Sequence, residues 1–298
     1  MKERILLFVS PFFLLTLIFL GTGCMSWEEG WKLAAEKPSG RNAAVILARA
    51  DRMARSADTK KKVLDLISAY RDVVSADPDN VSALSSLSSY YFLMGFGYSD
   101  TRSEKKDFYV RSIQAAERAM YTNPEFRKMI ESGEETCVAS AKLTDREMNA
   151  LMHYYLAVGC MWDECLSLPG KIINMGESAK FETILNNMVA INQDWGNGSV
   201  YMLLGTFYSV LPGILGGDLD RAAENFDRAV NAGPRMLSFR ETRAKVLYTK
   251  LKDRDAFVRD LESVVAQDPA DTESLEYAWA VWHRNNAKKM LANVDSYF

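Results

Sequence analysis

The stretch Gly198–Pro234 restricts the possible folds of this chain more than any other part of the sequence. Two small residues, Gly205 and Ala222, each precede an aromatic residue by about one helical turn, namely Tyr208 and Phe226. Small side chains let two helices approach closely, and large rings fill the seam between them. The proline that closes the stretch ends the second helix, because it cannot continue the hydrogen-bond ladder. The stretch therefore predicts an antiparallel pair of helices.

The order and spacing of these residues match the tetratricopeptide repeat (TPR). In this repeat a bulky residue, Leu-Gly and Tyr on one helix precede Ala, Phe and Pro on the next. Tyr201 takes the bulky position, and Leu204 precedes the glycine. Tyr208 and Ala222 stand 14 positions apart, whereas about 9 are usual in the repeat. The extra residues form an insertion, 211–218, whose apolar character is unusual for a loop between helices.

Weaker matches to the same repeat lie on both sides of this stretch. Closing prolines stand at positions 78, 124, 234 and 269, and the last interval is 35 residues, close to the repeat length of about 34. First-helix positions are matched by Leu84, Leu87 and Tyr91 and again by Met148, Leu151 and Tyr155. Together these units predict an all-α chain, an α-solenoid of degenerate TPR helix hairpins over residues 41–298. Asp271–Asn293 is predicted as its C-terminal capping helix.

The unit that follows the first closing proline departs from the repeat. Ser88 stands where the repeat carries its small glycine. The partner helix is expected at Arg111–Tyr121, with its tight face at Ala116 and Ala119. Thr101–Asp107 is interpreted as an insertion. The sequence therefore predicts a short second helix that begins well after the first has ended.

Length and composition exclude some classes of protein. The chain has 298 residues, of which 48% are hydrophobic, enough to bury a sizeable core. Its net charge is −3, so it lacks the strongly basic character that is typical of nucleic-acid binding proteins. We therefore expect no nucleic-acid partner.

The N-terminus has the layout of a secretion signal. Lys2 and Arg4 precede an almost continuous apolar run, Ile5–Leu20, and small residues then lead to Cys24. A cysteine in this place resembles the bacterial lipobox, in which the thiol is lipidated and becomes the new N-terminus. Gly21 departs from that pattern, which has a larger apolar residue there. A plain secretion signal and a single membrane span are the alternatives, although the run is shorter than the ~20 residues of a span and contains a proline.

Residues 1–23 are therefore predicted as a lipoprotein signal peptide and residues 24–40 as a lipidated tether. The protein is expected in the periplasm, held by acyl chains on Cys24. Two or three such chains hold a protein firmly, where one binds only marginally. Trp27 and Trp31 also fit a short docking helix within this segment. The sequence leaves open whether the anchor lies in the inner or the outer membrane.

Residues suited to catalysis or metal binding are few. His153 and His283 are the only histidines, and the sequence contains no nucleotide-binding, metalloprotease or serine-hydrolase motif. His153, Cys160 and Cys165 lie close together, but spacings of seven and five residues do not place three ligands on one helical face. We therefore expect no enzyme activity, no metal and no cofactor. A disulfide among these two cysteines and Cys137 stays an alternative, and a Cys160–Cys165 bond would require a break in the helix.

Aromatic residues are more numerous than the seams of such hairpins require. Tyr154-Tyr155 and Phe207-Tyr208 are adjacent pairs, and neighbours on a helix point about 100° apart. One ring of each pair is therefore expected to face a second surface, such as a concave groove or a central cavity.

Gly216-Gly217-Asp218 follows the apolar part of the insertion. Its local interpretation is a turn followed by an aspartate N-cap, with Asp220 favourably placed near the positive end of the next helix. This role does not prevent the loop from contacting a partner as well.

The unit from Tyr201 to Phe226 resembles the T component of TPR-associated tripartite ATP-independent periplasmic (TRAP) transporters. Members of that family carry a first repeat helix, a proline-containing insertion, Gly-Gly-Asp, and the Ala and Phe of a second helix, behind a lipoprotein signal. The matching residues are Pro212, Gly216, Gly217, Asp218, Ala223 and Phe226. The resemblance is specific over Gly198–Pro234, and over the rest of the chain it is a resemblance of architecture.

The resemblance implies a non-enzymatic periplasmic lipoprotein that binds the substrate-receptor subunit of a TRAP transporter. It also implies a homo-oligomer, such as a trimer, and an apolar cavity or pore for a hydrophobic or organic-acid ligand. From the surplus of aromatic residues and the insertion, the residues expected to contact partner or ligand are Tyr154, Tyr155, Trp162, Tyr201, Phe207, Leu211, Pro212, Gly216, Gly217 and Asp218. The alternative function is an outer-membrane assembly or scaffolding lipoprotein that binds a peptide or protein in its concave groove.

Overall fold

The computed structural model describes residues 25–33, 38–271 and 277–298, and every regular element in these ranges is a helix. The all-α prediction is therefore confirmed. The predicted signal peptide and Cys24 lie outside the described residues. None of the described helices combines the length and the apolar character that a membrane crossing requires.

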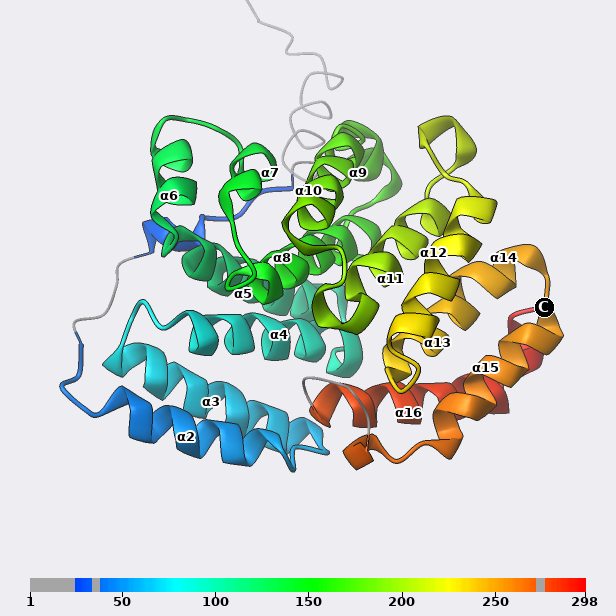
Figure 1. Cartoon of the computed structure of the whole chain (residues 1–298), viewed down its shortest axis with the longest axis horizontal. Coiled ribbons are helices and arrows are strands. Elements are labelled where there is room, and N and C mark those ends of the chain that lie inside the picture. Colours follow the sequence, from blue (N-terminus) through cyan, green and yellow to red (C-terminus); the bar gives the residue numbers. More distant parts are fainter. Residues whose placement is uncertain (1–24, 34–37, 272–276) are drawn as a thin grey trace, which may run out of the picture.

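Many helices that follow one another in the chain pack side by side (Figure 1). The α-helices are α2 (Ala43–Ala54), α3 (Lys60–Ala76), α4 (Val81–Tyr98), α5 (Arg102–Tyr121), α6 (Pro124–Glu131), α7 (Thr136–Ala139), α8 (Met148–Cys160), α9 (Leu168–Ile173), α10 (Glu177–Asn192), α11 (Trp195–Val210), α12 (Leu219–Ala232), α13 (Leu237–Arg243), α14 (Thr249–Leu251), α15 (Arg254–Ala266) and α16 (Tyr277–Ala292). Single 3-10 turns are η1 (Gly30–Lys32), η2 (Ser140–Lys142), η4 (Gly213–Leu215), η6 (Pro269–Asp271) and η7 (Val294–Ser296), and π-helical turns are η3 (Met161–Cys165) and η5 (Ala244–Tyr248).

Helices α11 and α12 form the hairpin that the most restrictive stretch of the sequence predicts. A Cβ atom on Gly205 would lie 2.8 Å from Cδ2 of Phe226, so the two helices approach as closely as a glycine allows. Tyr208, Ala222 and Phe226 are buried in the same contact. The second helix ends two residues before the closing proline.

Helices α4 and α5 meet through small polar residues in place of a glycine. The hydroxyl of Ser88 donates to the carbonyl oxygen of Ser112 (2.9 Å), and the hydroxyl of Ser112 donates to the carbonyl oxygen of Ser88 (2.8 Å). The predicted start of the partner helix at Arg111 was wrong, because α5 begins at Arg102 and so includes most of the segment interpreted as an insertion. Its start is fixed by a capping box, in which the Thr101 hydroxyl and the Glu104 carboxylate each accept from the other's backbone N–H.

The C-terminal helix does more than cover the last hairpin. Helix α16 packs on α15 and also reaches back to α4. The indole N–H of Trp279 donates to the Ser89 hydroxyl (2.8 Å), and that of Trp282 donates to the carbonyl oxygen of Gly97 (3.2 Å). We call this contact the α4–α16 seam, and it consists of Ser89, Phe92, Phe96, Gly97, Trp279 and Trp282. It joins an early hairpin of the chain to its final helix.

Candidate functional site

The N-terminal segment, residues 25–33, is docked on helix α5. Glu117 lies on the face of α5 toward the segment and is 1% exposed. One carboxylate oxygen accepts from the indole N–H of Trp27 (2.9 Å), and the other accepts from the backbone N–H of Gly30 (2.6 Å). A buried carboxylate therefore holds the segment through two hydrogen bonds.

Contacts on either side of Glu117 complete the docking. The side-chain amide of Gln114 donates to the carbonyl oxygen of Glu28 (2.9 Å). The ring of Trp31 stacks on that of Tyr121, with centroids 5.6 Å apart. A Cβ atom on Gly30 would fall 2.0 Å from the carbonyl oxygen of Gln114, so only glycine fits at the closest point. These contacts match the docking that Trp27 and Trp31 suggest in the sequence.

The segment also reaches helix α9. The backbone N–H of Met25 donates to the side-chain oxygen of Asn174 (3.4 Å), the residue that follows α9. Met25 directly follows Cys24, so the chain enters the described structure beside this helix.

A pocket of about 500 Å³ lies between the docked segment, the helices α5, α8 and α10, and the part of the chain that runs from α6 to α7. We call it the N-terminal pocket. Its aromatic lining consists of Trp27, Trp31, Tyr154 and Phe181, and its aliphatic lining includes Met25, Ile130, Val158 and Ile184. Its ionisable lining residues include Glu29, Glu117, Glu134, Glu135 and Glu177 as acids and Lys32 and Lys180 as bases. The pocket combines apolar walls with an excess of carboxylates.

Burial raises the pKa of two groups that line this pocket. It raises the pKa of Glu117 to about 7, although the hydrogen bonds from Gly30 and Trp27 oppose the shift. Burial also raises the pKa of the Tyr154 hydroxyl, so this ring stays neutral at physiological pH. Glu117 is therefore a buried carboxyl group that titrates near neutral pH.

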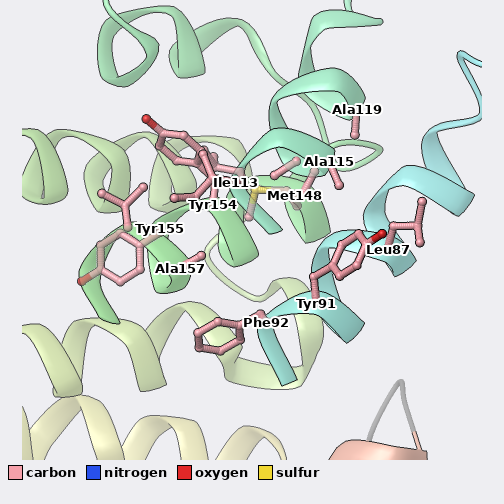
Figure 2. Packing of buried hydrophobic residues seen from close by; sticks show 14 of the residues in the cluster. Leu87, Tyr91, Phe92, Ile113, Ala115, Ala119, Met148, Tyr154, Tyr155 and Ala157 are labelled. Carbon is pink, nitrogen blue, oxygen red and sulfur yellow. The ribbon is translucent and has the colours of Figure 1, made fainter. Parts of the chain in front are cut away.

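The adjacent tyrosines predicted to contact a ligand lie in different surroundings. Tyr154 and Tyr155 leave α8 in different directions, as Figure 2 shows. Tyr154 lines the N-terminal pocket. The ring of Tyr155 meets that of Phe181 edge to face, with centroids 5.4 Å apart. Both tyrosines are buried, and the structure brings Tyr154 to the pocket.

The other predicted aromatic residues lie apart from the N-terminal pocket. Trp162 lies in η3, with the ammonium group of Lys171 5.3 Å from its ring centroid. The Tyr201 hydroxyl donates to Asp194 (3.4 Å). Phe207 is buried against Tyr208, with ring centroids 5.4 Å apart. As contacts for a partner these residues stay predictions.

The insertion between α11 and α12 has a local structural role. Gly216 has a left-handed backbone, with φ at +95°. A Cβ atom on Gly217 would lie 1.9 Å from the carbonyl oxygen of Leu211. The Asp218 carboxylate caps α12 by accepting from the backbone N–H groups of Asp220 and Arg221, both at 3.0 Å. The predicted turn and N-cap are therefore confirmed. Leu211 and the exposed Pro212 stay predictions for a partner contact.

The histidine and cysteines considered for a metal site have ordinary structural surroundings. Burial lowers the pKa of His153 to about 4, and its Nδ1 lies 2.9 Å from the carbonyl oxygen of Asn149, so the ring is a neutral, packed imidazole. Cys137, Cys160 and Cys165 are free thiols. Within residues 25–33, 38–271 and 277–298, no group of three or more His, Cys, Asp or Glu residues could hold a metal ion.

Sequence reasoning missed Glu117 and therefore missed the pocket. A signal was present, because Glu117 interrupts the buried stripe of α5 between Ile113 and Met120. A carboxylate inside an apolar stripe requires a hydrogen-bond partner from elsewhere in the fold. Nothing in the local pattern says which segment supplies it.

Comparison with known proteins supports the resemblance over most of the chain. A family model described as TRAP transporter T-component matches residues 74–298. No curated protein matches the sequence. The match begins near the end of α3 and includes both α5 and the α11–α12 hairpin.

Proposed function

Because the chain belongs to the TRAP transporter T-component family, we propose that it is a non-enzymatic accessory lipoprotein that binds the substrate-receptor subunit of such a transporter in the periplasm. The observation that carries this proposal is the family match over residues 74–298. It covers the helices that form the N-terminal pocket as well as the hairpin that carries the sequence resemblance.

Ligand sheltering is the second part of the proposal. The N-terminal pocket is large enough for a small organic molecule and has aromatic walls. Its acidic lining residues outnumber its basic ones, so an organic acid would meet net repulsion there. We therefore retain a hydrophobic ligand in the proposal, extend it to an apolar ligand with a positive charge, and no longer include an organic acid at this site.

A binding experiment tests both parts. The full lipidated protein is incubated at micromolar concentration with the receptor subunit of a TRAP transporter from the same organism, and the complex is isolated by pull-down. Native mass spectrometry then gives its stoichiometry, including any homo-oligomer, and the mass of any retained ligand. We expect a complex with the receptor. A failure to bind at this concentration would contradict the accessory role.

Variants separate receptor binding from ligand retention. Phe181 lines the pocket, whereas Tyr201 does not contribute to its lining. We expect Phe181→Ala to reduce the retained ligand and to leave the receptor complex intact. Tyr201→Ala should leave the ligand unchanged. Equal ligand loss in both variants would place the ligand elsewhere.

Lipidation has its own test. Changing Cys24 to Ser removes the thiol to which acyl chains are expected to attach. We expect the protein to leave the membrane fraction. Unchanged partitioning into detergent would refute lipidation and leave the rest of the proposal standing.

A further inference from the structure

The surface beside the docked N-terminal segment is unusually apolar. Leu168, Ile172 and Ile173 of α9 and Met175 just beyond it are between 44% and 72% exposed. Large aliphatic side chains gathered on so short a piece of surface mark an interaction site more often than they mark chance exposure. We call these four residues the α9 patch.

The path of the chain indicates what meets this patch. Met25 is hydrogen-bonded to Asn174, which lies between Ile173 and Met175 in the sequence. The residue before Met25 is Cys24, the expected site of acylation. Acyl chains attached there would enter the bilayer within one residue of a contact with α9. The α9 patch is thus beside the point at which the protein is expected to be anchored.

A second group of exposed apolar side chains lies on the same edge of the molecule as α9. Figure 1 shows α9 and the connection between α11 and α12 at that edge. In this connection Ile214 is 94% exposed, and Val210 at the end of α11 is 50% exposed. Two separate contacts and one anchor are enough to fix how a rigid body lies on a flat surface.

The charges near the patch favour apolar insertion over electrostatic attraction. Lys171, between the patch residues of α9, is paired with Asp163 (2.6 Å). The loop before α7 carries the exposed Glu134 and Glu135. With Lys171 paired to Asp163 and Lys180 paired to Glu135, such a surface offers anionic headgroups little attraction, whereas aliphatic side chains can enter the boundary between headgroups and acyl chains of any lipid.

We propose that the α9 patch and the tip of the α11–α12 hairpin contact the lipid bilayer, so that this edge of the lipoprotein faces the membrane. The inference rests on the lipidation of Cys24 included in the proposed function. It orients the protein and keeps the N-terminal pocket, which Met25 and α10 help to line, close to the membrane surface.

Photolabelling from the lipid side tests this orientation. The full lipidated protein is reconstituted into phosphatidylcholine and phosphatidylethanolamine vesicles that contain a lipid with a diazirine on its acyl chain, and labelled residues are mapped by mass spectrometry. We expect labelling of residues 168–175 at least about tenfold above that of α2, whose Val45 is also 65% exposed. Replacing a third of the lipid by the anionic phosphatidylglycerol should not increase the labelling of residues 168–175.

Matched variants sharpen the result. The double change Ile172→Ser and Ile173→Ser removes exposed apolar atoms from the patch, and we expect it to reduce labelling there about tenfold. Val45→Ser should have no effect. Circular dichroism confirms that each variant is folded. Labelling of α9 no higher than that of α2, or cross-links between protein copies at α9 without lipid labels, would overturn the proposal.

The intact mass of the purified protein distinguishes the two possible failures. A mass without acyl chains refutes lipidation, and with it the reason for this edge to meet the bilayer. A protein that is acylated but unlabelled at residues 168–175 refutes only the membrane-facing orientation and leaves the accessory function untouched.

Discussion

Two contacts in this protein join parts of the chain that are far apart in sequence, and they do so in different ways. In the α4–α16 seam the indole N–H of Trp279 donates to Ser89. At the N-terminal segment the indole N–H of Trp27 donates to Glu117. Both contacts use a tryptophan as a large apolar surface with one polar group. What surrounds that polar group differs.

The α4–α16 seam is filled with rings. Phe92 and Trp279 have centroids 5.5 Å apart, and Phe96 and Trp282 have centroids 5.1 Å apart. The docked N-terminal segment, in contrast, leaves a pocket of about 500 Å³. The rings of the α4–α16 seam pack against one another, whereas the docked segment leaves a pocket beside its buried carboxylate.

The pKa values of the buried carboxylates in the two regions are shifted in opposite directions. Burial raises the pKa of Glu117, and no cation compensates for it fully. Burial also tends to raise the pKa of Glu241, next to α16, but hydrogen bonds from His283 and Asn286 and the charges of His283 and Lys245 together hold the pKa below its ordinary value. Rising pH should therefore loosen the docked segment, and falling pH should loosen the contact of α13 with α16.

The largest effect is expected in the α4–α16 seam. Phe92 is buried among Phe96, Tyr109, His153 and Trp279. Phe92→Ala should lower the free energy of unfolding by about 3–5 kcal/mol, because it leaves a cavity in a packed cluster. Denaturant unfolding measures this free energy. As a control, Val45→Ala at an exposed position should change the free energy of unfolding by less than about 0.5 kcal/mol. A loss below about 1 kcal/mol for Phe92→Ala would show that the seam is not tightly packed.

A somewhat smaller effect is expected for the buried carboxylate beside α16. Glu241 accepts from Nδ1 of His283 (3.0 Å) and from the side-chain amide of Asn286 (2.6 Å). Glu241→Gln should reduce stability at pH 7 by about 2–3 kcal/mol, since it replaces hydrogen bonds to a charged acceptor.

The pH dependence of this variant provides the control. In the native chain the stabilisation is present above the ordinary pKa of 4.5 and is lost as pH falls below it, because the folded-state pKa is lowered. The Gln variant should lack this acid-dependent loss in unfolding curves recorded from pH 3 to pH 7. Identical curves for both proteins would show that another group controls acid sensitivity.

The free energy of docking is expected to change by about 2 kcal/mol when the pH is raised past the pKa of Glu117. The Glu117 pKa is about 7 in the docked state, against an ordinary value of 4.5. Taking the ordinary pKa for Glu117 in the undocked state, the docked state binds the proton more tightly, and docking should weaken by about 2 kcal/mol between pH 5.5 and pH 8. Hydrogen exchange of the Gly30 amide, corrected for its intrinsic pH dependence, measures docking. Glu117→Gln should remove the dependence, and its persistence would exclude Glu117 as the titrating group.

The smallest effect is expected from a single hydrogen bond of the segment. Trp27→Phe keeps an aromatic ring and removes the indole N–H that donates to Glu117. Docking should weaken by about 1 kcal/mol, again read from exchange at Gly30, and global stability should hardly change. A large loss of global stability would mean that the segment is part of the core and not a contact that can open.

Much of the local structure could be predicted from the sequence. The α11–α12 hairpin, the close approach at Gly205 and the Asp218 cap follow from patterns within a few turns of helix. The start of α5 differs from the prediction because the capping box of Thr101 and Glu104 begins the helix at a position that the repeat spacing does not indicate. Tyr154 was expected at a ligand surface and lines the pocket, whereas the side chains that hold the docked segment were not expected there.

The sequence by itself determined that the chain is helical, where α12 is capped, and how the most regular hairpin is packed. These features depend on residues a few positions apart, whose spacing is visible along the chain. Only the tertiary structure decided that Glu117 accepts a hydrogen bond from Gly30, 87 residues away. The same is true of the hydrogen bond that Ser89 accepts from Trp279, 190 residues away. The pocket and the seam arise from such pairs, and no local period encodes which distant residue will satisfy a buried polar group.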